Sequence, residues 1–130
     1  MPPPAEIGRP MSAAVRYIVE DVDAARDFYV AALGFESVKH NSGKFAELHR
    51  DGTTLYLNAP GAGSGGQAGG VPVPGGWNRM MIVTRDLEAL ISRARQAGAK
   101  FRGGVSAGGA GRAILVEDPS GNPVELFEFK

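Results

Sequence analysis

The sequence contains one pattern twice, and the two copies together limit the folds that the chain can adopt. In each copy an aspartate, Asp21 or Asp86, precedes apolar residues at helical spacing, and a glycine, Gly34 or Gly98, follows them. Aspartate is favoured at a helix N-cap and glycine just beyond a helix C-terminus, so each copy predicts one capped helix. A repeat of about 65 residues therefore indicates a duplicated module.

Extended segments surround both predicted helices. They occupy residues 13–19, 35–38, 45–49 and 53–57 in the first copy, and 79–83, a segment from 101, and 112–129 in the second. Asp51-Gly52 is a strong two-residue hairpin signal. Each copy thus has the order β-α-β-β-β. One module alone leaves a sheet face uncovered, so the sequence predicts an α+β fold of two tandem β-α-β-β-β modules that form a curled mixed sheet around a shared cavity.

The length of 130 residues suits a single domain. We expect residues 1–11 to form a disordered leader and residues 12–130 to form the domain. Module one spans residues 12–59 and module two spans residues 77–130. Residues 60–76 between them are rich in glycine and proline without periodicity, which is typical of a linker loop.

Composition excludes several classes of protein. The 14 basic and 14 acidic residues balance, so neither nucleic acid nor an anionic membrane is an expected partner. The absence of cysteine excludes disulfides and thiolate metal sites. No apolar run is long enough to span a membrane, and the first residues lack a signal-peptide pattern, so we expect a cytoplasmic location.

The C-terminal segment places a carboxylate among apolar residues. Asp118-Pro119-Ser120-Gly121 is a turn sequence, and Glu125 lies in the strand that follows. Glu125 faces solvent on an alternating strand, or it projects into a cavity as a ligand or acid–base group. The segment resembles the C-terminal signature of the glyoxalase/bleomycin-resistance/extradiol-dioxygenase (vicinal oxygen chelate) superfamily. Phe28-Tyr29 and Leu33-Gly34-Phe35 resemble its FY…LGF segment, and the family is built from duplicated β-α-β-β-β units.

The resemblance implies where a metal site would lie. Metal enzymes of the family take ligands seven residues before each capping aspartate, on the last strand of module one, and at the C-terminal glutamate. Here those positions hold Ala14, Arg79, one of residues 55–58, and Glu125. Only Glu125 matches as a metal ligand. We therefore expect no cofactor, with a divalent Fe, Mn, Ni or Zn ion as the alternative.

The same positions suggest a different use of the cavity. Arg79 and Glu125 are expected to form an ion pair, which either fills the lost metal site or binds a ligand while Glu125 acts as the catalytic acid–base group. Trp77 either stacks on an aromatic ligand or anchors the loop. The predicted ligand-binding residues are Arg79, Arg16, Tyr56, Asn58 and Trp77. Arg112 is also expected to reach the cavity rim. Glu47 and His49 share a strand face, and they either bind a metal ion or, as we expect, face outward to solvent.

Three hypotheses of function follow from the resemblance. The first is a small-molecule-binding protein with a degenerate metal site, a homodimer that sequesters a drug or metabolite of acidic or aromatic character. The second is a glyoxalase-like lyase or isomerase, or an extradiol-type dioxygenase, which depends on a metal or uses Glu125 as general base. The third is a structural or regulatory dimer, which predicts a cavity filled by side chains.

Overall fold

The computed structural model of the chain describes residues 13–62 and 69–130, so the predicted leader at 1–11 lies outside the described residues. The first module contains β1 (Val15–Ile18), α1 (Val22–Leu33), β2 (Glu36–Asn41), β3 (Phe45–Arg50) and β4 (Thr53–Asn58). The second contains β5 (Met81–Val83), α2 (Leu87–Gln96), β6 (Lys100–Ala107), β7 (Gly111–Glu117) and β8 (Pro123–Phe129). The prediction of two tandem β-α-β-β-β modules is confirmed.

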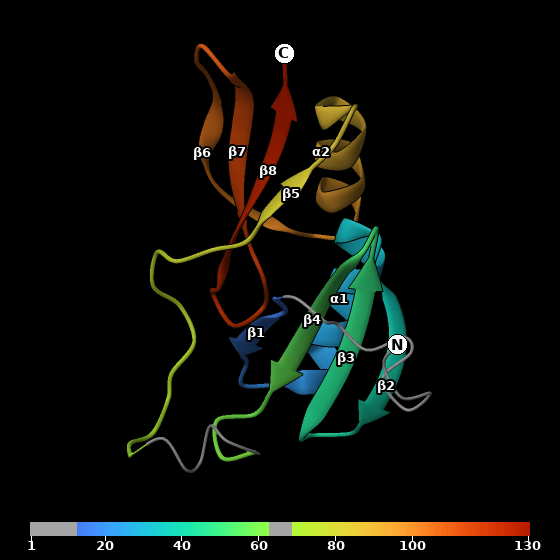
Figure 1. Ribbon diagram of the computed structural model, residues 1–130, viewed down its shortest axis with the longest axis vertical. Helices are drawn as coiled ribbons and strands as arrows, with labels where there is room; N and C mark the ends of the chain where they lie inside the picture. The colour runs from blue at the N-terminus through green and yellow to red at the C-terminus, as the bar shows by residue number, and fades with distance from the viewer. Residues whose placement is uncertain (1–12, 63–68) are drawn as a thin grey trace, which may run out of the picture.

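Both modules have the same strand topology. The strand order is β1-β4-β3-β2 in the first sheet and β5-β8-β7-β6 in the second. The first strand of each module is parallel to the last, and the other pairs are antiparallel. Figure 1 shows one sheet above the other, with α1 behind the lower sheet and α2 beside the upper one. The chain therefore forms two four-stranded sheets where the sequence predicted one curled sheet.

Local signals account for the helix and hairpin boundaries. Asp21 and Asp86 each accept a hydrogen bond from a backbone N–H of the first turn, as N-caps do. Gly34 ends α1 in the left-handed region at φ 77°, which glycine adopts without strain. Asp51 and Gly52 have φ values of 46° and 82°, the positive pair that a two-residue hairpin turn between β3 and β4 requires.

Alternation along the strands separates an inner face from an outer face in each sheet. Leu55 and Leu57 of β4 are fully buried in the core with the apolar face of α1, and Val124 and Leu126 of β8 are buried in the same way beside α2. The intervening side chains point to the opposite, outer face. No helix within residues 13–62 and 69–130 is long and apolar enough to cross a membrane.

A tyrosine of module one fixes the start of two strands in module two. The Tyr17 hydroxyl donates to the carbonyl of Pro123 and accepts from the N–H of Met80, both at 2.8 Å. Glu125 N–H donates to the Met80 carbonyl at 3.0 Å, which joins β8 to the residue before β5. The contact matters for the site because Arg79 and Glu125 lie directly beside these anchored residues.

Candidate functional site

The strand register shows which position of module one corresponds to Glu125. Arg16 and Met81 both stand five residues before a helix-capping aspartate. Arg16 lies opposite Tyr56 on β4, and Met81 lies opposite Glu125 on β8. Tyr56 is therefore the counterpart of Glu125, which settles the position that sequence spacing left among residues 55–58.

Arg79 and Glu125 form the ion pair that was expected from the sequence. Arg79 Nε donates to Glu125 Oε1 at 3.0 Å, and Arg79 Nη1 donates to the Trp77 carbonyl at 3.1 Å. The side chains are 35% and 19% exposed, so the pair is half-buried and open to solvent on one side. Pairing of this kind offsets the cost of partly desolvating the two charges.

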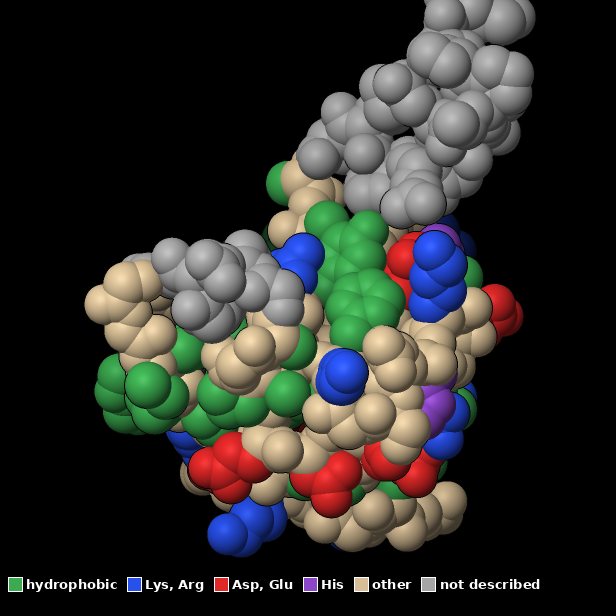
Figure 2. All heavy atoms as spheres, turned by 90° about the horizontal axis from the view of Figure 1, so that it is seen from below, with side chains coloured by type: hydrophobic (Ala, Val, Ile, Leu, Met, Phe, Trp, Pro, Cys, Tyr) green, Lys and Arg blue, Asp and Glu red, His purple; other side chains and the backbone are tan. Residues whose placement is uncertain are grey.

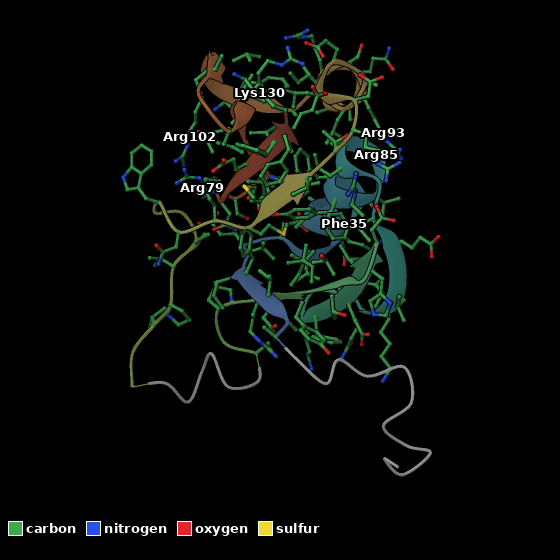
Figure 3. The ribbon with its side chains drawn as sticks, turned by 45° about the horizontal axis from the view of Figure 1, so that its top comes forward. Phe35, Arg79, Arg85, Arg93, Arg102 and Lys130 are labelled. Carbon is green, nitrogen blue, oxygen red and sulfur yellow. The ribbon has the colours of Figure 1, made fainter. Side chains whose placement is uncertain are left out.

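The ion pair lines a small cavity on the outer face of the second sheet. The cavity has a volume of about 240 Å³, and its lining residues are Arg79, Arg102, Gly104, Ser106, Ala113, Ile114, Leu115 and Glu125. All of them belong to module two. Figure 3 shows Arg79 and Arg102 next to each other on the side of module two away from α2. Aliphatic side chains and two arginines thus surround one carboxylate.

Arg102 is a cavity residue that the sequence analysis missed. Its Nε donates to Glu117 at 2.9 Å, its Nη2 donates to the Gly121 carbonyl at 3.1 Å, and its guanidinium lies 5.0 Å from the centre of the Trp77 ring. Trp77 is 71% exposed. Trp77 is thus attached by its carbonyl to Arg79 and by its ring to Arg102, which holds the end of the linker beside the cavity.

The predicted ligand-binding residues fall into two groups. Arg16 and Asn58 line a different cavity, of about 710 Å³, on module one. Arg16 Nη1 donates to Asn58 Oδ1 at 2.7 Å, and its guanidinium lies 5.1 Å from the centre of the Tyr56 ring. The lining of neither cavity includes a residue from the other module within the described ranges. Within one chain, the predicted ligand-binding residues Arg16 and Asn58 thus do not share a cavity with Arg79 and Glu125.

Two other expectations are wrong. Glu47 lies on the outer face of the first sheet beside its cross-strand neighbour Tyr56, but it is buried there and not exposed to solvent, and its Oε2 lies 2.8 Å from His49 Nε2. Arg112 does not reach the cavity at Arg79, because its guanidinium is held by Glu88 of α2 and by Glu128. The acidic partners hold the pKa of Arg112 above its ordinary value, so it remains a cation.

The residues at the four equivalent positions do not fit a transition metal. The Ala14 side chain has no donor atom and Arg79 is a permanent cation, which leaves the oxygens of Tyr56 and Glu125 on two different sheets. Across residues 13–62 and 69–130, no group of three His, Cys, Asp or Glu side chains is arranged to hold a metal ion. Fe, Mn, Ni and Zn sites need three or four such ligands.

Comparison with known proteins decides the family. The model of the Glyoxalase/Bleomycin resistance protein/Dioxygenase superfamily matches residues 12–126. The chain belongs to this superfamily. No protein of curated function matches the sequence.

Solved structures of superfamily-like proteins share the fold over nearly the whole chain. A lactoylglutathione lyase from Agrobacterium tumefaciens is 21% identical, with a TM-score of 0.71 and coverage of 92% of this chain and 95% of that one. TioX from Micromonospora sp. ML1 is 21% identical, with a TM-score of 0.72 and coverage of 92% and 99%. A superfamily member from Sphaerobacter thermophilus DSM 20745 is 26% identical, with a TM-score of 0.69 and coverage of 91% and 98%. At such identities the likeness concerns the fold and leaves the ligand to be argued from the site.

Proposed function

We propose that this superfamily member binds a small organic acid on the outer face of module two, without a resident metal ion. The observation that carries the proposal is the Arg79–Glu125 ion pair, which occupies two of the four positions equivalent to the superfamily's metal ligands. A guanidinium group holds a carboxylate through two parallel hydrogen bonds, so this arginine suits an anionic ligand.

One edge of the Arg79 guanidinium is open to a ligand. Its Nε and Nη1 donate to Glu125 and to the Trp77 carbonyl. Within the described residues, Nη2 makes no hydrogen bond. Since the side chain is 35% exposed, a ligand carboxylate can reach Nη2 without breaking the ion pair.

The size of the cavity limits what it holds. Its volume of about 240 Å³ is below the roughly 300–1,000 Å³ of pockets that take drug-sized ligands. The wall is aliphatic, with Ala113, Ile114 and Leu115 beside the charged groups. The cavity therefore suits a carboxylate and a short apolar or aromatic group, and Trp77 can stack on a ring that extends from it. Binding of this kind supports a role in sequestering a drug or metabolite.

We propose that a second copy of the chain completes the site. Met81, Val83 and Phe129 lie on the same outer face and are 45%, 48% and 55% exposed. Exposed apolar side chains gathered on one face are typical of an interface. A homodimer would cover them and enlarge the small cavity at Arg79 from the other side.

Glu125 also supports a second candidate function, an enzyme of the lyase or isomerase type. One of its oxygens is held by Arg79 and the side chain remains 19% exposed at the cavity. A carboxylate oriented beside an arginine can remove a proton next to a carbonyl group while the arginine stabilises the charge that develops. In that case Glu125→Gln abolishes turnover of an identified substrate and leaves its binding intact. Unchanged turnover in that variant would refute the role.

An NMR titration with benzoate tests the binding proposal, and benzamide is the neutral control of the same shape. We expect benzoate to shift the Arg79 Nε–H and Trp77 indole signals and benzamide to leave them unchanged. Arg79→Gln should remove the response, while Arg112→Gln, an arginine outside the cavity, should keep it. An equal response to benzamide, or a full response in Arg79→Gln, would contradict the proposal.

Elemental analysis tests the absence of a metal. Protein purified without chelators should contain far less than one equivalent of Fe, Mn, Ni or Zn, because only Glu125 among the equivalent positions is a good ligand. A stoichiometric, tightly held metal would show that the ligands lie elsewhere and would favour the enzyme.

A further inference from the structure

We propose a second ligand site in module one, at Arg16 and Lys44, that binds an anion carrying a flat aromatic body, such as an aromatic sulfonate or carboxylate. Within one chain it is lined by different residues from the site at Arg79, and it is tested separately. The proposal rests on the cavity, on the way the Arg16 guanidinium is held, and on the absence of Asp and Glu from the described residues that line the cavity.

The cavity lies at one end of the first sheet. Its volume is about 710 Å³, and its lining residues are Arg16, Asn41, Lys44, Phe45, Asn58, Ala59, Gly61 and Ala62. They come from β1, the β2–β3 turn with the adjoining ends of β2 and β3, the end of β4 and the segment after it. Figure 2 shows this end of the molecule, where hydrophobic side chains lie next to basic ones. The volume is within the range of pockets that take a drug-sized ligand.

The guanidinium of Arg16 is held in place before a ligand arrives. Its Nη1 donates to Oδ1 of Asn58 at 2.7 Å, and Asn58 is buried. The Arg16 guanidinium lies 5.1 Å from the Tyr56 ring, which itself stacks on Phe45 at 5.8 Å with 25° between the ring planes. A cation fixed in this way loses little side-chain entropy when an anion binds.

Lys44 approaches the same cavity from the β2–β3 turn. Its N–H donates to the Asn41 carbonyl, and its own carbonyl accepts from the Ala59 N–H, both at 3.0 Å. These two bonds fix the backbone of Lys44 against the end of β4. Lys44 is therefore a fixed residue of the cavity lining, contributed by the turn while Arg16 comes from β1.

The two cations have no acidic partner in the part of the chain that the structure describes. Asp and Glu are absent from the described residues that line the cavity. Within residues 13–62 and 69–130, neither Arg16 nor Lys44 forms an ion pair, whereas Arg79 and Arg102 each pair with a glutamate. The carboxylate of Asp23 on α1 accepts hydrogen bonds from the β2–β3 turn and pairs with neither cation, so both cations remain open to an anion from outside.

The remaining wall sets the shape of the ligand. Phe45, Ala59 and Ala62 supply apolar surface to the cavity wall. An apolar wall with a few convergent polar groups is the usual composition of a small-molecule site. A ligand with a charged group for Arg16 and Lys44 and an aromatic ring for Phe45 matches both features.

Two dyes test the site in the full chain. The anionic dye is 8-anilinonaphthalene-1-sulfonate, and N-phenyl-1-naphthylamine is its neutral counterpart without the sulfonate. Fluorescence titration should show tighter binding of the anionic dye and a loss of that preference at high salt. Equal affinity for both dyes, or no binding of the sulfonate, would overturn the proposal.

Four variants locate the binding. Arg16→Gln and Lys44→Gln should each raise the Kd of the sulfonate about tenfold, because each removes a charge-assisted contact. Lys44→Gln keeps the test valid if loss of the Arg16–Asn58 bond destabilises the fold. Lys39→Gln, a lysine of the same hairpin outside the cavity, should leave the Kd unchanged, and Arg79→Gln should remove only the sulfonate that binds in the other cavity. An unchanged Kd of the sulfonate in Lys44→Gln would refute the site, as would an increase in Lys39→Gln equal to that in Lys44→Gln. Both results are independent of benzoate binding at Arg79.

Discussion

The hydroxyl of Tyr29 donates a hydrogen bond to the carboxylate of Asp118 at 2.9 Å, which joins α1 of module one to the turn between β7 and β8. Asp118 also accepts from the N–H groups of Ser120 and Asn122 and from the Asn122 side-chain amide. The amide of Asn122 in turn donates to the Ile18 carbonyl. One buried carboxylate therefore organises the turn and attaches it to the other module.

The first prediction concerns stability at alkaline pH. Burial raises the pKa of Tyr29 well above 10, and the charge of Asp118 raises it further. The folded protein thus keeps the phenol proton at pH values where the unfolded chain has lost it, so this contribution to stability is complete below pH 10 and is lost as pH rises above 10. Urea unfolding of wild type and Tyr29→Phe should show a smaller fall in the free energy of unfolding above pH 10 for the variant.

At pH 7 the same substitution should cost about 1 kcal/mol, because Asp118 keeps its other three donors. Tyr56→Phe, on the outer face of the first sheet, is the matched control and should change neither quantity. If the free energy of unfolding falls equally with pH in wild type and in Tyr29→Phe, the loss of stability above pH 10 does not come from Tyr29.

The second prediction concerns the start of β7. A side chain at Gly111 would collide with the backbone carbonyl of Glu128 on β8, whereas a side chain at Gly109 would meet no atom within 4 Å. Gly111→Ala should therefore destabilise the fold by about 1–3 kcal/mol, as overpacking does, and Gly109→Ala should have little effect. Thermal unfolding of the two variants checks this, and equal melting temperatures would show that the β7–β8 ladder relaxes at no cost.

Local signals explain why the elements could be predicted from the sequence. Helix caps and tight turns depend only on residues next to them in the sequence. A few residues therefore suffice to predict the ends of α1 from Asp21 and Gly34 and the hairpin from Asp51-Gly52. The Arg79–Glu125 pair was also predictable, because both residues stand at fixed distances from recognisable motifs.

The features that could not be predicted from the sequence depend on contacts between segments that are distant in the chain. Arg102 escaped notice because β6 shifts register between Arg102 and Ser106, so spacing alone does not place it opposite Leu115. The burial of Glu47 was missed because period-two alternation does not say which face of a strand is covered. The separation of Arg16 from Arg79 follows from how the modules pack, with Arg93 of α2 donating to carbonyls at the end of α1.

The third prediction concerns Tyr17, whose hydroxyl holds Met80 and Pro123. Tyr17→Phe keeps the ring against Tyr29 and removes both hydrogen bonds. We expect a loss of about 1–3 kcal/mol in stability, faster hydrogen exchange of the Met80 amide, and weaker benzoate binding although Tyr17 does not line the cavity. If the exchange rate rises while benzoate binding is unchanged, the anchor does not position Arg79.

The fourth prediction tests the homodimer through a grafted metal site. Ala14 and Tyr56 belong to module one, and Arg79 and Glu125 belong to module two, whose cavity includes no residue of module one. If a second copy brings the outer faces of the two modules together, Ala14→His and Tyr56→Glu on one chain should complete a site with Arg79→His and the native Glu125 on another. Three or four such ligands suit Zn²⁺.

The two variant chains should each bind little Zn²⁺ alone and should bind about one equivalent per mixed dimer after they are unfolded and refolded together. Gel filtration followed by elemental analysis of the dimer fraction measures this. Wild type mixed with the Arg79→His chain is the control and should remain low in metal. Zn²⁺ bound by a monomeric triple variant would show that the two modules of one chain form the site, and no Zn²⁺ in the mixed dimer would contradict this mode of pairing.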